Sequence, residues 1–301
     1  MYKQYLIIRG HPRVIDTYCY LMCNIWLFDM NCFVVFRSYK QEDESFCKKL
    51  LKNGVMSLIN PTYNEILVRG ITFEIPIFMI VIILILFGVP LIHSLLVMPI
   101  VASIIYITLY AKFLNKANEI QKEVSNIPRI YMSNNSSCFW VAEVYEKNSL
   151  NYSQQDQEYI LMTEEEFNYS DIDISSYIKK IVGTIALCKN NRIPNGAWIK
   201  RLYVHKDYRK KSIGSFLLNV ALEFSIMQGY NRVNIVISEY RKDAKKLCIR
   251  KGFELYLCYK KPVFRSLITM LVYELTYQIN YYINENFMAI DPYYAYYILN
   301  S

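Results

Sequence analysis

The stretch that decides the fold is Arg209-Lys210-Lys211-Ser212-Ile213-Gly214, a basic turn that ends on glycine. Residues 198–204 precede it and are predicted to form a strand, and residues 215–228 follow as an amphipathic helix. Backbone N–H groups at the start of a helix have no intrahelical partner, and the helix dipole adds positive potential there. With three cationic side chains in the turn, this arrangement predicts a site for pyrophosphate or another polyphosphate.

The turn matches neither of two common phosphate-binding motifs. It lacks the GxxxxGK[ST] pattern of a P-loop and the GxGxxG pattern of a dinucleotide-binding fold. The alternative is a solvated basic turn that binds no ligand. The neighbouring segments of the chain therefore have to decide between the two interpretations.

The segments after the turn predict a sheet covered by helices. Gly229 ends the first helix, and strands are expected at 233–237 and 253–259. Between these strands, a helix is expected at 243–250 and is closed by Gly252. Strands that alternate with helices in this way indicate an α/β fold.

Three further strands are expected before the turn. Phe33–Phe36 reads as a short buried strand that leads into a helix beginning near Glu42–Glu44. Cys138–Val144 and Lys180–Cys188 read as neighbouring strands. Between them lies an acidic insertion, residues 146–178, which carries no Lys or Arg after residue 147 and is expected to be a solvated hairpin.

Residues 75–111 form an apolar segment without Asp, Glu, Lys or Arg. As one straight helix the segment would measure about 55 Å, well beyond the ~30 Å hydrocarbon core of a bilayer. Gly88-Val89-Pro90 near its middle favours a break, so we expect a membrane hairpin with two legs. Lys and Arg flank both ends, which predicts that both flanks are cytosolic. The alternative is a pair of buried helices in a soluble protein.

The composition is that of a packed protein, with 53% hydrophobic and 20% charged residues. The mean hydropathy of +0.12 agrees with a membrane segment. Basic runs at 200–211 and 241–251 contribute to the net charge of +8 and suit a polyanion. Nucleic acid is not the expected partner, because no aromatic stacking pattern accompanies these runs. The eight cysteines occur singly, so we expect reduced thiols and neither a disulfide framework nor a metal site.

The two ends of the chain are less informative. Residues 1–32 show no clear period and receive no role, and the main domain is expected to cover 33–261. The aromatic segment 262–301 has apolar residues at helical spacing between Phe264 and Ile279. We expect this helix either to pack on the sheet or to lie at the bilayer surface.

The basic turn resembles the acetyl-CoA loop of the GNAT acetyltransferase superfamily, which follows the pattern Arg/Gln-x-x-Gly-x-Gly/Ala between a strand and a helix. Ser212 stands where the family has its first glycine. Downstream, Ala244-x-x-Leu247-Cys248-x-x-x-Gly252-Phe253 resembles the family's Ala-x-x-Leu-Tyr-x-x-x-Gly-Phe helix end. Gly229-Tyr230 before the intervening strand completes an ordered set of marks.

The resemblance narrows to the membrane-anchored camello-type branch, the family of N-acetyltransferase 8. Those proteins have an apolar hairpin after the first helix and a Ser-Cys-Phe-Trp-Val-Ala-Glu strand, here Ser137–Glu143. The resemblance then runs from about Phe33 to Lys261. It implies the mixed-sheet GNAT acyltransferase fold with an inserted membrane hairpin, in the endoplasmic reticulum membrane with the catalytic domain facing the cytosol.

The resemblance also implies the chemistry. An acceptor amine would attack the thioester of acetyl-CoA directly, and a backbone N–H of the strand around residues 202–204 would hold the oxyanion. That strand would also pair with pantetheine, and the turn would hold the pyrophosphate. The expected acetyl-CoA-binding residues are Leu202, Tyr203, Val204, Arg209, Lys210, Lys211, Ser212, Ile213, Gly214 and Ser215.

The candidate catalytic residues are Glu143, Tyr203, Glu239 and Cys248. The family's usual tyrosine acid falls at Cys248, a thiol that either donates a proton or packs in the core. Glu143, His205 and Glu239 are candidate bases at strand ends, because the acceptor must lose a proton to become nucleophilic.

The expected function is a membrane-anchored N-acetyltransferase that uses acetyl-CoA. Its acceptor is an amine on a small molecule, such as a cysteine conjugate or an amino acid, or a protein lysine. The alternative is a catalytically impaired relative that binds CoA or protein partners at the membrane.

Overall fold

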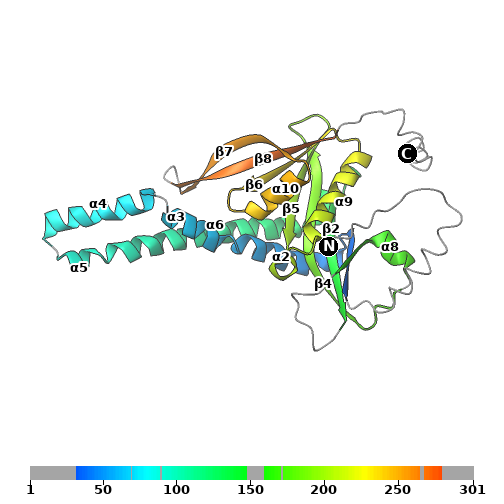
Figure 1. Cartoon of the computed structure of the whole chain (residues 1–301), viewed down its shortest axis with the longest axis horizontal. Helices are drawn as coiled ribbons and strands as arrows, with labels where there is room; N and C mark the ends of the chain where they lie inside the picture. The colour runs from blue at the N-terminus through cyan, green and yellow to red at the C-terminus, as the bar shows by residue number, and fades with distance from the viewer. Residues whose placement is uncertain are drawn as a thin grey trace, which may run out of the picture.

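The structure is a computed structural model that describes residues 32–68, 70–88, 90–147, 159–170, 172–264 and 268–279. Its centre is an eight-stranded mixed sheet with the order β3-β1-β2-β4-β5-β6-β8-β7 (Figure 1). The strands are β1 (Cys32–Ser38), β2 (Cys138–Lys147), β3 (Ile160–Thr163), β4 (Tyr177–Asn190), β5 (Gly196–Val204), β6 (Arg232–Ser238), β7 (Glu254–Phe264) and β8 (Ile268–Gln278). The mixed α/β fold expected from the sequence is confirmed.

Helices cover both faces of the sheet. The remaining elements are η1 (Gln41–Asp43), α2 (Glu44–Met56), α3 (Ile59–Val68), α4 (Gly70–Phe87), α5 (Leu91–Ser94), α6 (Val97–Val124), α7 (Ile127–Tyr131), α8 (Glu164–Tyr169), η2 (Lys206–Tyr208), α9 (Ile213–Met227) and α10 (Lys242–Arg250). Helices α9 and α10 pack on one face through a core that includes Leu217, Ala221 and Cys248. Helices α2 and α6 pack on the other face through residues such as Leu51 and Ile120.

The apolar hairpin of the sequence is present as two helical legs that extend away from the sheet (Figure 1). The break falls where expected, because Gly88 ends the first leg with φ +60°, a conformation that glycine adopts at no steric cost. The second leg, α6, is long and apolar enough to cross a membrane. Its apolar stretch has a mean hydropathy of 1.8, and only 6% of that stretch is buried inside the structure. Helix α6 also runs on through Val124, so the polar residues after the apolar segment continue the same helix.

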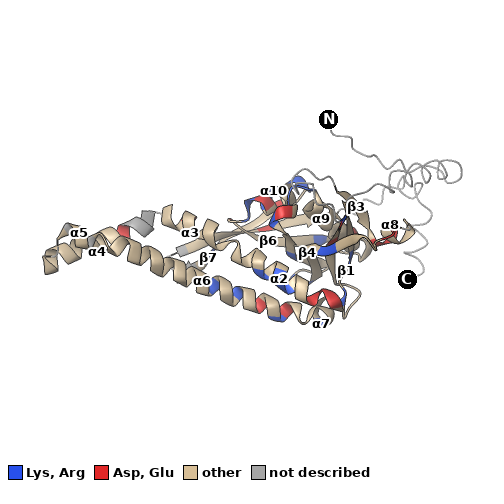
Figure 2. Cartoon of the chain, turned by 90° about the horizontal axis from the view of Figure 1, so that it is seen from below, with Lys and Arg blue, Asp and Glu red and all other residues tan. Residues whose placement is uncertain are grey.

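Charge is distributed along α6 in a way that separates its two ends. Figure 2 shows basic and acidic residues, which are Lys and Glu in the sequence of α6, on the part of the helix that lies next to the sheet, whereas the far end of the hairpin is uncharged. Large apolar side chains such as Phe87, Ile92 and Ile100 are exposed there. The near end of α6 is instead anchored in the core by Ala117 and Ile120.

The expectation of a helix in the aromatic C-terminal segment is wrong. Residues 268–278 form β8, which is inserted between β6 and β7 and pairs antiparallel with both. Its sequence ITMLVYELTYQ is rich in β-branched and aromatic residues, and pairing on both edges outweighs the apolar spacing. The sheet therefore extends past the boundary expected at residue 261, and residues 280–301 lie outside the described part.

Two other expected segments are described only in part. Residues 1–31 lie outside the described part, and Cys32 is the first residue of β1. Within the acidic insertion, β3 pairs parallel with β1, and α8 begins with a capping box formed by Thr163 and Glu166. This part of the insertion thus adds an edge strand to the sheet, and residues 148–158 and 171 lie outside the described part.

Candidate active site

The site begins where two parallel strands of the sheet separate. β5 and β6 pair only from Gly196–Ile199 to Arg232–Ile235. Beyond this point β5 continues along β4, and β6 continues along β8 as far as Ser238. The end of β5, residues 200–204, therefore has an edge that β6 does not cover, and a gap of this kind at the carboxyl ends of strands is a common ligand site.

A bulge in β5 produces this separation. Arg201 has φ +55°, and the register between β4 and β5 shifts between Thr184 and Ala186. The Arg201 guanidinium forms an ion pair with Glu123 in the last turn of α6, and Tyr131 also donates to Glu123. On the β4 side, Thr184 Oγ1 donates a 2.9 Å hydrogen bond to the carbonyl oxygen of Arg201, which also holds the bulge in place. No local sequence pattern predicts this bulge.

The basic turn connects this edge to the start of α9. Lys210 and Ser212 both have positive φ, +64° and +60°. Ser212 therefore adopts the left-handed conformation that the glycine of the family pattern would adopt more easily. The bond from the Phe216 N–H to the carbonyl oxygen of Ser212, at 3.0 Å, opens the helix, so the N–H groups of residues 213–215 precede its hydrogen-bond ladder.

The cations of the turn lie on aromatic rings at its two sides. The Arg209 side chain donates to the carbonyl oxygen of Val204 at 3.2 Å and lies 5.6 Å from the ring centre of Tyr203. Lys211 Nζ lies 4.4 Å from the ring centre of Tyr159, which belongs to the acidic insertion. These contacts orient two positive charges beside the helix start, which favours an anion there.

Tyr203 is held against α2 by a close approach to Gly54. A Cβ atom added at Gly54 would lie 2.6 Å from the Tyr203 ring, so only glycine fits. The ring is buried and its strand position faces α2. Of the four candidate catalytic residues, Tyr203 is the one that the structure places on the open part of β5.

Glu143 is placed elsewhere, on β2, with β4 between it and β5. It is 5% exposed and accepts hydrogen bonds from Arg37 Nε at 2.8 Å and from the Tyr145 hydroxyl at 3.0 Å. Arg37 also binds Asp43 through two bonds of 2.7 and 2.9 Å. Burial alone would lower the pKa of Arg37, but its bonds to Asp43 and Glu143 raise it, so the guanidinium stays charged.

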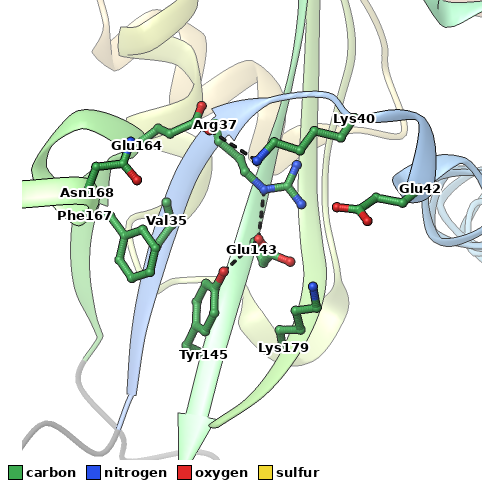
Figure 3. Close-up of a pocket in the computed structure, with 10 residues that line it drawn as sticks. All are labelled: Val35, Arg37, Lys40, Glu42, Glu143, Tyr145, Glu164, Phe167, Asn168 and Lys179. Atoms are coloured by element: carbon green, nitrogen blue, oxygen red, sulfur yellow. Dashed lines mark hydrogen bonds and ion pairs between the residues drawn. The ribbon is translucent and has the colours of Figure 1, made fainter. Parts of the chain in front are cut away.

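The same cluster lines a small polar cavity of about 110 Å³ (Figure 3). The cavity is lined by Val35, Arg37, Lys40, Glu42, Glu143, Tyr145, Glu164, Phe167, Asn168 and Lys179. Figure 3 shows the Arg37 guanidinium between the β1 ribbon and the Glu143 carboxylate. The structure thus gives Glu143 the role of an ion-pair partner that joins β1 to β2.

The other two candidates are also engaged. Glu239, directly after β6, accepts a 2.9 Å hydrogen bond from the N–H of Leu271 on β8. Cys248 is fully buried among α9, α10 and the sheet, and burial raises the pKa of its thiol to about 12. Such a thiol is a poor proton donor at neutral pH, and its place in the core matches the packing alternative.

One residue of the site was missed by sequence reasoning. Arg241, at the start of α10, donates from Nη1 to the carbonyl oxygen of Leu202 at 3.4 Å, across the gap between β5 and β6. Burial lowers the pKa of Arg241, and the nearby charges of Arg209 and Arg201 lower the pKa further. Tyr203 acts in the opposite direction and raises this pKa. The sequence showed this residue only as part of a basic run, and its position depends on the tertiary fold.

His205 closes the open end of β5. Burial lowers the pKa of its imidazole, and Lys180 adds to the effect, with Asp207 opposing it. It is therefore neutral at pH 7. Among the described residues, no group of three or more His, Cys, Asp or Glu side chains could hold a metal ion.

Comparison with known proteins supports this description. Residues 127–253 match the model of the acetyltransferase (GNAT) family. The chain is 24% identical over 147 residues to a probable N-acetyltransferase camello of Xenopus tropicalis, covering 48% of this chain and 52% of that protein. It is 24% identical over 165 residues to N-acetyltransferase family 8 member 3 of Rattus norvegicus, covering 54% and 59%. The chain thus spans just over half the length of these relatives.

A solved acetyltransferase of the GNAT family from Staphylococcus aureus is 15% identical, with a TM-score of 0.40 over 80% of this chain and 98% of that one. The resemblance to camello-type acetyltransferases is confirmed by the family match and the two relatives. The open edge of β5, the basic turn and the start of α9 all lie within the matched residues. Over residues 127–253 this chain is similar to the acetyltransferase (GNAT) family.

Proposed function

We propose that this protein is a membrane-anchored N-acetyltransferase that transfers the acetyl group of acetyl-CoA to an amine. The observation that supports it most is the uncovered edge of β5, which leads directly into the N-terminus of α9. The two features follow one another along the chain. A long ligand could therefore bind the strand edge with its peptide-like arm and the helix N-terminus with its pyrophosphate. The matched family and the two relatives agree with this reaction.

The residues present fit acetyl-CoA at both ends of the site. The N–H groups of residues 213–215 and the cations of the turn would hold the pyrophosphate. The backbone groups of residues 202–204 that β4 does not pair would bond the amides of pantetheine, as a neighbouring strand would. The carbonyl oxygens of Leu202 and Val204 would first be released by the Arg241 and Arg209 side chains. Acetyl-CoA bound there supplies an activated acyl group as a thioester.

The chain's own groups would then act on the reacting centre. A backbone N–H on the open edge of β5 would stabilise the oxyanion that develops at the thioester carbonyl. The acceptor must be a neutral amine, and its proton would pass to a base or to water. His205, neutral at pH 7, lies at the end of this edge and is the base candidate that the geometry favours over the ion-paired Glu143.

The apolar hairpin is the proposed membrane anchor. Helix α2 before it and helix α6 after it pack together on one face of the sheet. Both ends of the hairpin must therefore emerge on the same side of the bilayer. The positive charge on both flanks favours the cytosol, and we place the protein in the endoplasmic reticulum membrane.

The acceptor is proposed to be a small-molecule amine, such as a cysteine conjugate or an amino acid, or a protein lysine. A panel of these amines, with acetyl-CoA consumption as the readout, tests the function in wild type and in Arg209→Glu. We expect turnover in wild type and an affinity for acetyl-CoA about 10- to 100-fold lower in the variant, because one cation is replaced by an anion. Arg192→Glu, in the exposed turn between β4 and β5, is the matched control and should behave as wild type.

Unchanged affinity in Arg209→Glu would remove the turn from the site. The second candidate function is CoA binding without turnover, and the burial of Cys248 favours it because the usual acid is missing. Tight CoA binding by wild type with no acetyl transfer to any amine would establish that function instead.

Orientation is tested separately through the N-x-Ser sequons at Asn134, Asn135, Asn151 and Asn168. With the domain in the cytosol these asparagines stay unmodified in cells. Glycosylation at any of them would place the domain in the lumen and overturn the proposed orientation.

A further inference from the structure

Acetyl transfer leaves a negative charge on the sulfur of CoA. The amine nitrogen forms a bond to the carbonyl carbon, the C–S bond breaks, and its electron pair moves to sulfur. A free thiol has a pKa near ~8.5, so at neutral pH the departing thiolate is stabilised further when a proton or a cation lies beside the sulfur. The open edge of β5 is therefore where a group that supplies one of the two would act.

Cys248 does not provide the proton. Its side chain has no exposed surface and lies in the core between α10 and the sheet. Tyr256, another tyrosine near this position in the sequence, is 53% exposed on the edge strand β7, where Arg232 lies over its ring. Neither group faces the gap between β5 and β6.

Arg241 does face this gap. Its Nη1 donates to the carbonyl oxygen of Leu202 at 3.4 Å, which is a long hydrogen bond. Among the described residues it forms no ion pair with a carboxylate, although Arg37 and Arg201 both do. A partly buried guanidinium without a counter-ion is unusual, because burial of a charge is costly unless an opposite charge accompanies it.

We propose that the guanidinium of Arg241 stabilises the CoA sulfur as the thiolate leaves. This inference rests on the proposed function. The amides of pantetheine would pair with the same edge of β5 and take over the carbonyl oxygen of Leu202. The long bond from Arg241 would then be released, and its N–H groups would face the thioester. The thiolate leaves as an anion paired with Arg241 and takes a proton from solvent on release, so no protein acid is needed.

The physical reason is a charge-assisted hydrogen bond in a site with little water. Such bonds are stronger than neutral ones, and a nearby cation lowers the pKa of a thiol. Arg241 remains charged even though burial lowers its pKa, because an arginine side chain does not deprotonate in proteins. It therefore acts as a fixed positive charge and not as an acid.

The test compares Arg241→Met and Arg241→Lys with wild type in the full chain. We expect kcat to fall about 10- to 100-fold in Arg241→Met, the range for one charged hydrogen bond, with a nearly unchanged KM for acetyl-CoA. Arg241→Lys should recover part of this loss. Arg250→Met, exposed at the other end of α10, is the matched control and should keep the wild-type kcat.

A binding readout separates the sulfur from the rest of the cofactor. Calorimetry with CoA and with desulfo-CoA should show that wild type prefers CoA, increasingly so as the pH rises through the range in which the thiol ionises. Arg241→Met should lose this preference and its pH dependence. The ultraviolet absorbance of the thiolate should also appear at a lower pH in CoA bound to wild type than in CoA bound to the variant.

Three results would overturn the inference. The first is an equal loss of affinity for CoA and desulfo-CoA with an unchanged kcat, which would make Arg241 a contact for pantetheine or pyrophosphate. The second is a loss confined to acceptors that carry a carboxylate. The third result would be a wild-type kcat in Arg241→Lys together with no preference for CoA over desulfo-CoA. This result decides the question if Arg241→Met does not fold. Wild type that neither binds CoA nor acetylates any amine would instead reject the proposed function itself.

Discussion

Ser212→Gly should stabilise this protein, although most substitutions destabilise. Ser212 has φ +60° and ψ −2°, and its side chain makes no capping hydrogen bond. The left-handed conformation costs an L-residue about 1–2 kcal/mol, and glycine avoids this cost. Glycine loses about 0.5–1 kcal/mol more conformational entropy on folding, which offsets part of the gain. The net expectation is a rise of about 0.5–1 kcal/mol in the free energy of unfolding.

Thermal unfolding in detergent, followed by circular dichroism, measures this effect. A gain of that size corresponds to a Tm higher by about 1–4 °C in a protein of this size. Ser215→Gly is the matched control, because it is the same substitution in the first turn of α9 at a helical φ. It should lower stability by about 0.5–1 kcal/mol. If Ser212→Gly lowers Tm as Ser215→Gly does, the argument from backbone strain at Ser212 is wrong.

The remaining predictions concern groups that shape the open edge of β5. Gly54→Ala should lower the free energy of unfolding by about 1–2 kcal/mol and displace the Tyr203 ring. The added methyl group overpacks the contact, and this cost exceeds the gain in helix propensity. Differential scanning calorimetry measures the loss of stability. Glu123→Gln should lower stability by about 1–3 kcal/mol and reduce kcat/KM for acetyl-CoA, because the partly buried Arg201 loses its counter-ion and the bulge loosens. His205 should make the free energy of unfolding fall as the pH drops from about 7 through the usual histidine pKa of ~6.5. The reason is that folding favours the neutral imidazole and lowers its pKa. In His205→Gln the free energy of unfolding should depend less on pH over this range.

The two predictions at Gly54 and Glu123 each have a control in the same helix. Asn53→Ala, exposed beside Gly54 on α2, should leave Tm unchanged. Glu119→Gln removes an exposed ion pair with Lys116 on α6 and should have little effect. A Glu123→Gln variant with wild-type kcat/KM would show that the ion pair does not shape the site. An equal pH dependence in wild type and His205→Gln would assign the acid sensitivity to other groups.

The sequence predicted most of the sheet because local pattern and tertiary environment agree there. The segments around Phe33–Phe36, Cys138–Val144 and residues 198–204 are apolar strands in the core, and the structure keeps them as strands. The prediction failed at residues 268–278, where apolar spacing suggested a helix. Pairing of β8 with both β6 and β7 decides that segment, and such long-range pairing is not visible in local spacing.

The site was predictable only where backbone geometry follows from a local motif. The turn at 209–214 could be located because a strand, a basic stretch and a helix follow one another. The bulge at Arg201 could not, because it depends on Glu123, which lies 78 positions away in the sequence. Arg241 likewise reaches the site only because α10 begins opposite Leu202. The motif thus predicts where a ligand would bind, and long-range contacts shape the proposed site around it.

Helix α6 connects the proposed membrane anchor to the candidate site. It is continuous from Val97 to Val124, so the apolar part that ends near Ala111 and the carboxylate of Glu123 belong to one rigid element. Twelve residues of helix span about 18 Å, which sets the distance between the end of the apolar part and the ion pair at Arg201. In the proposed membrane-bound state the open edge of β5 is therefore held at a fixed height above the bilayer.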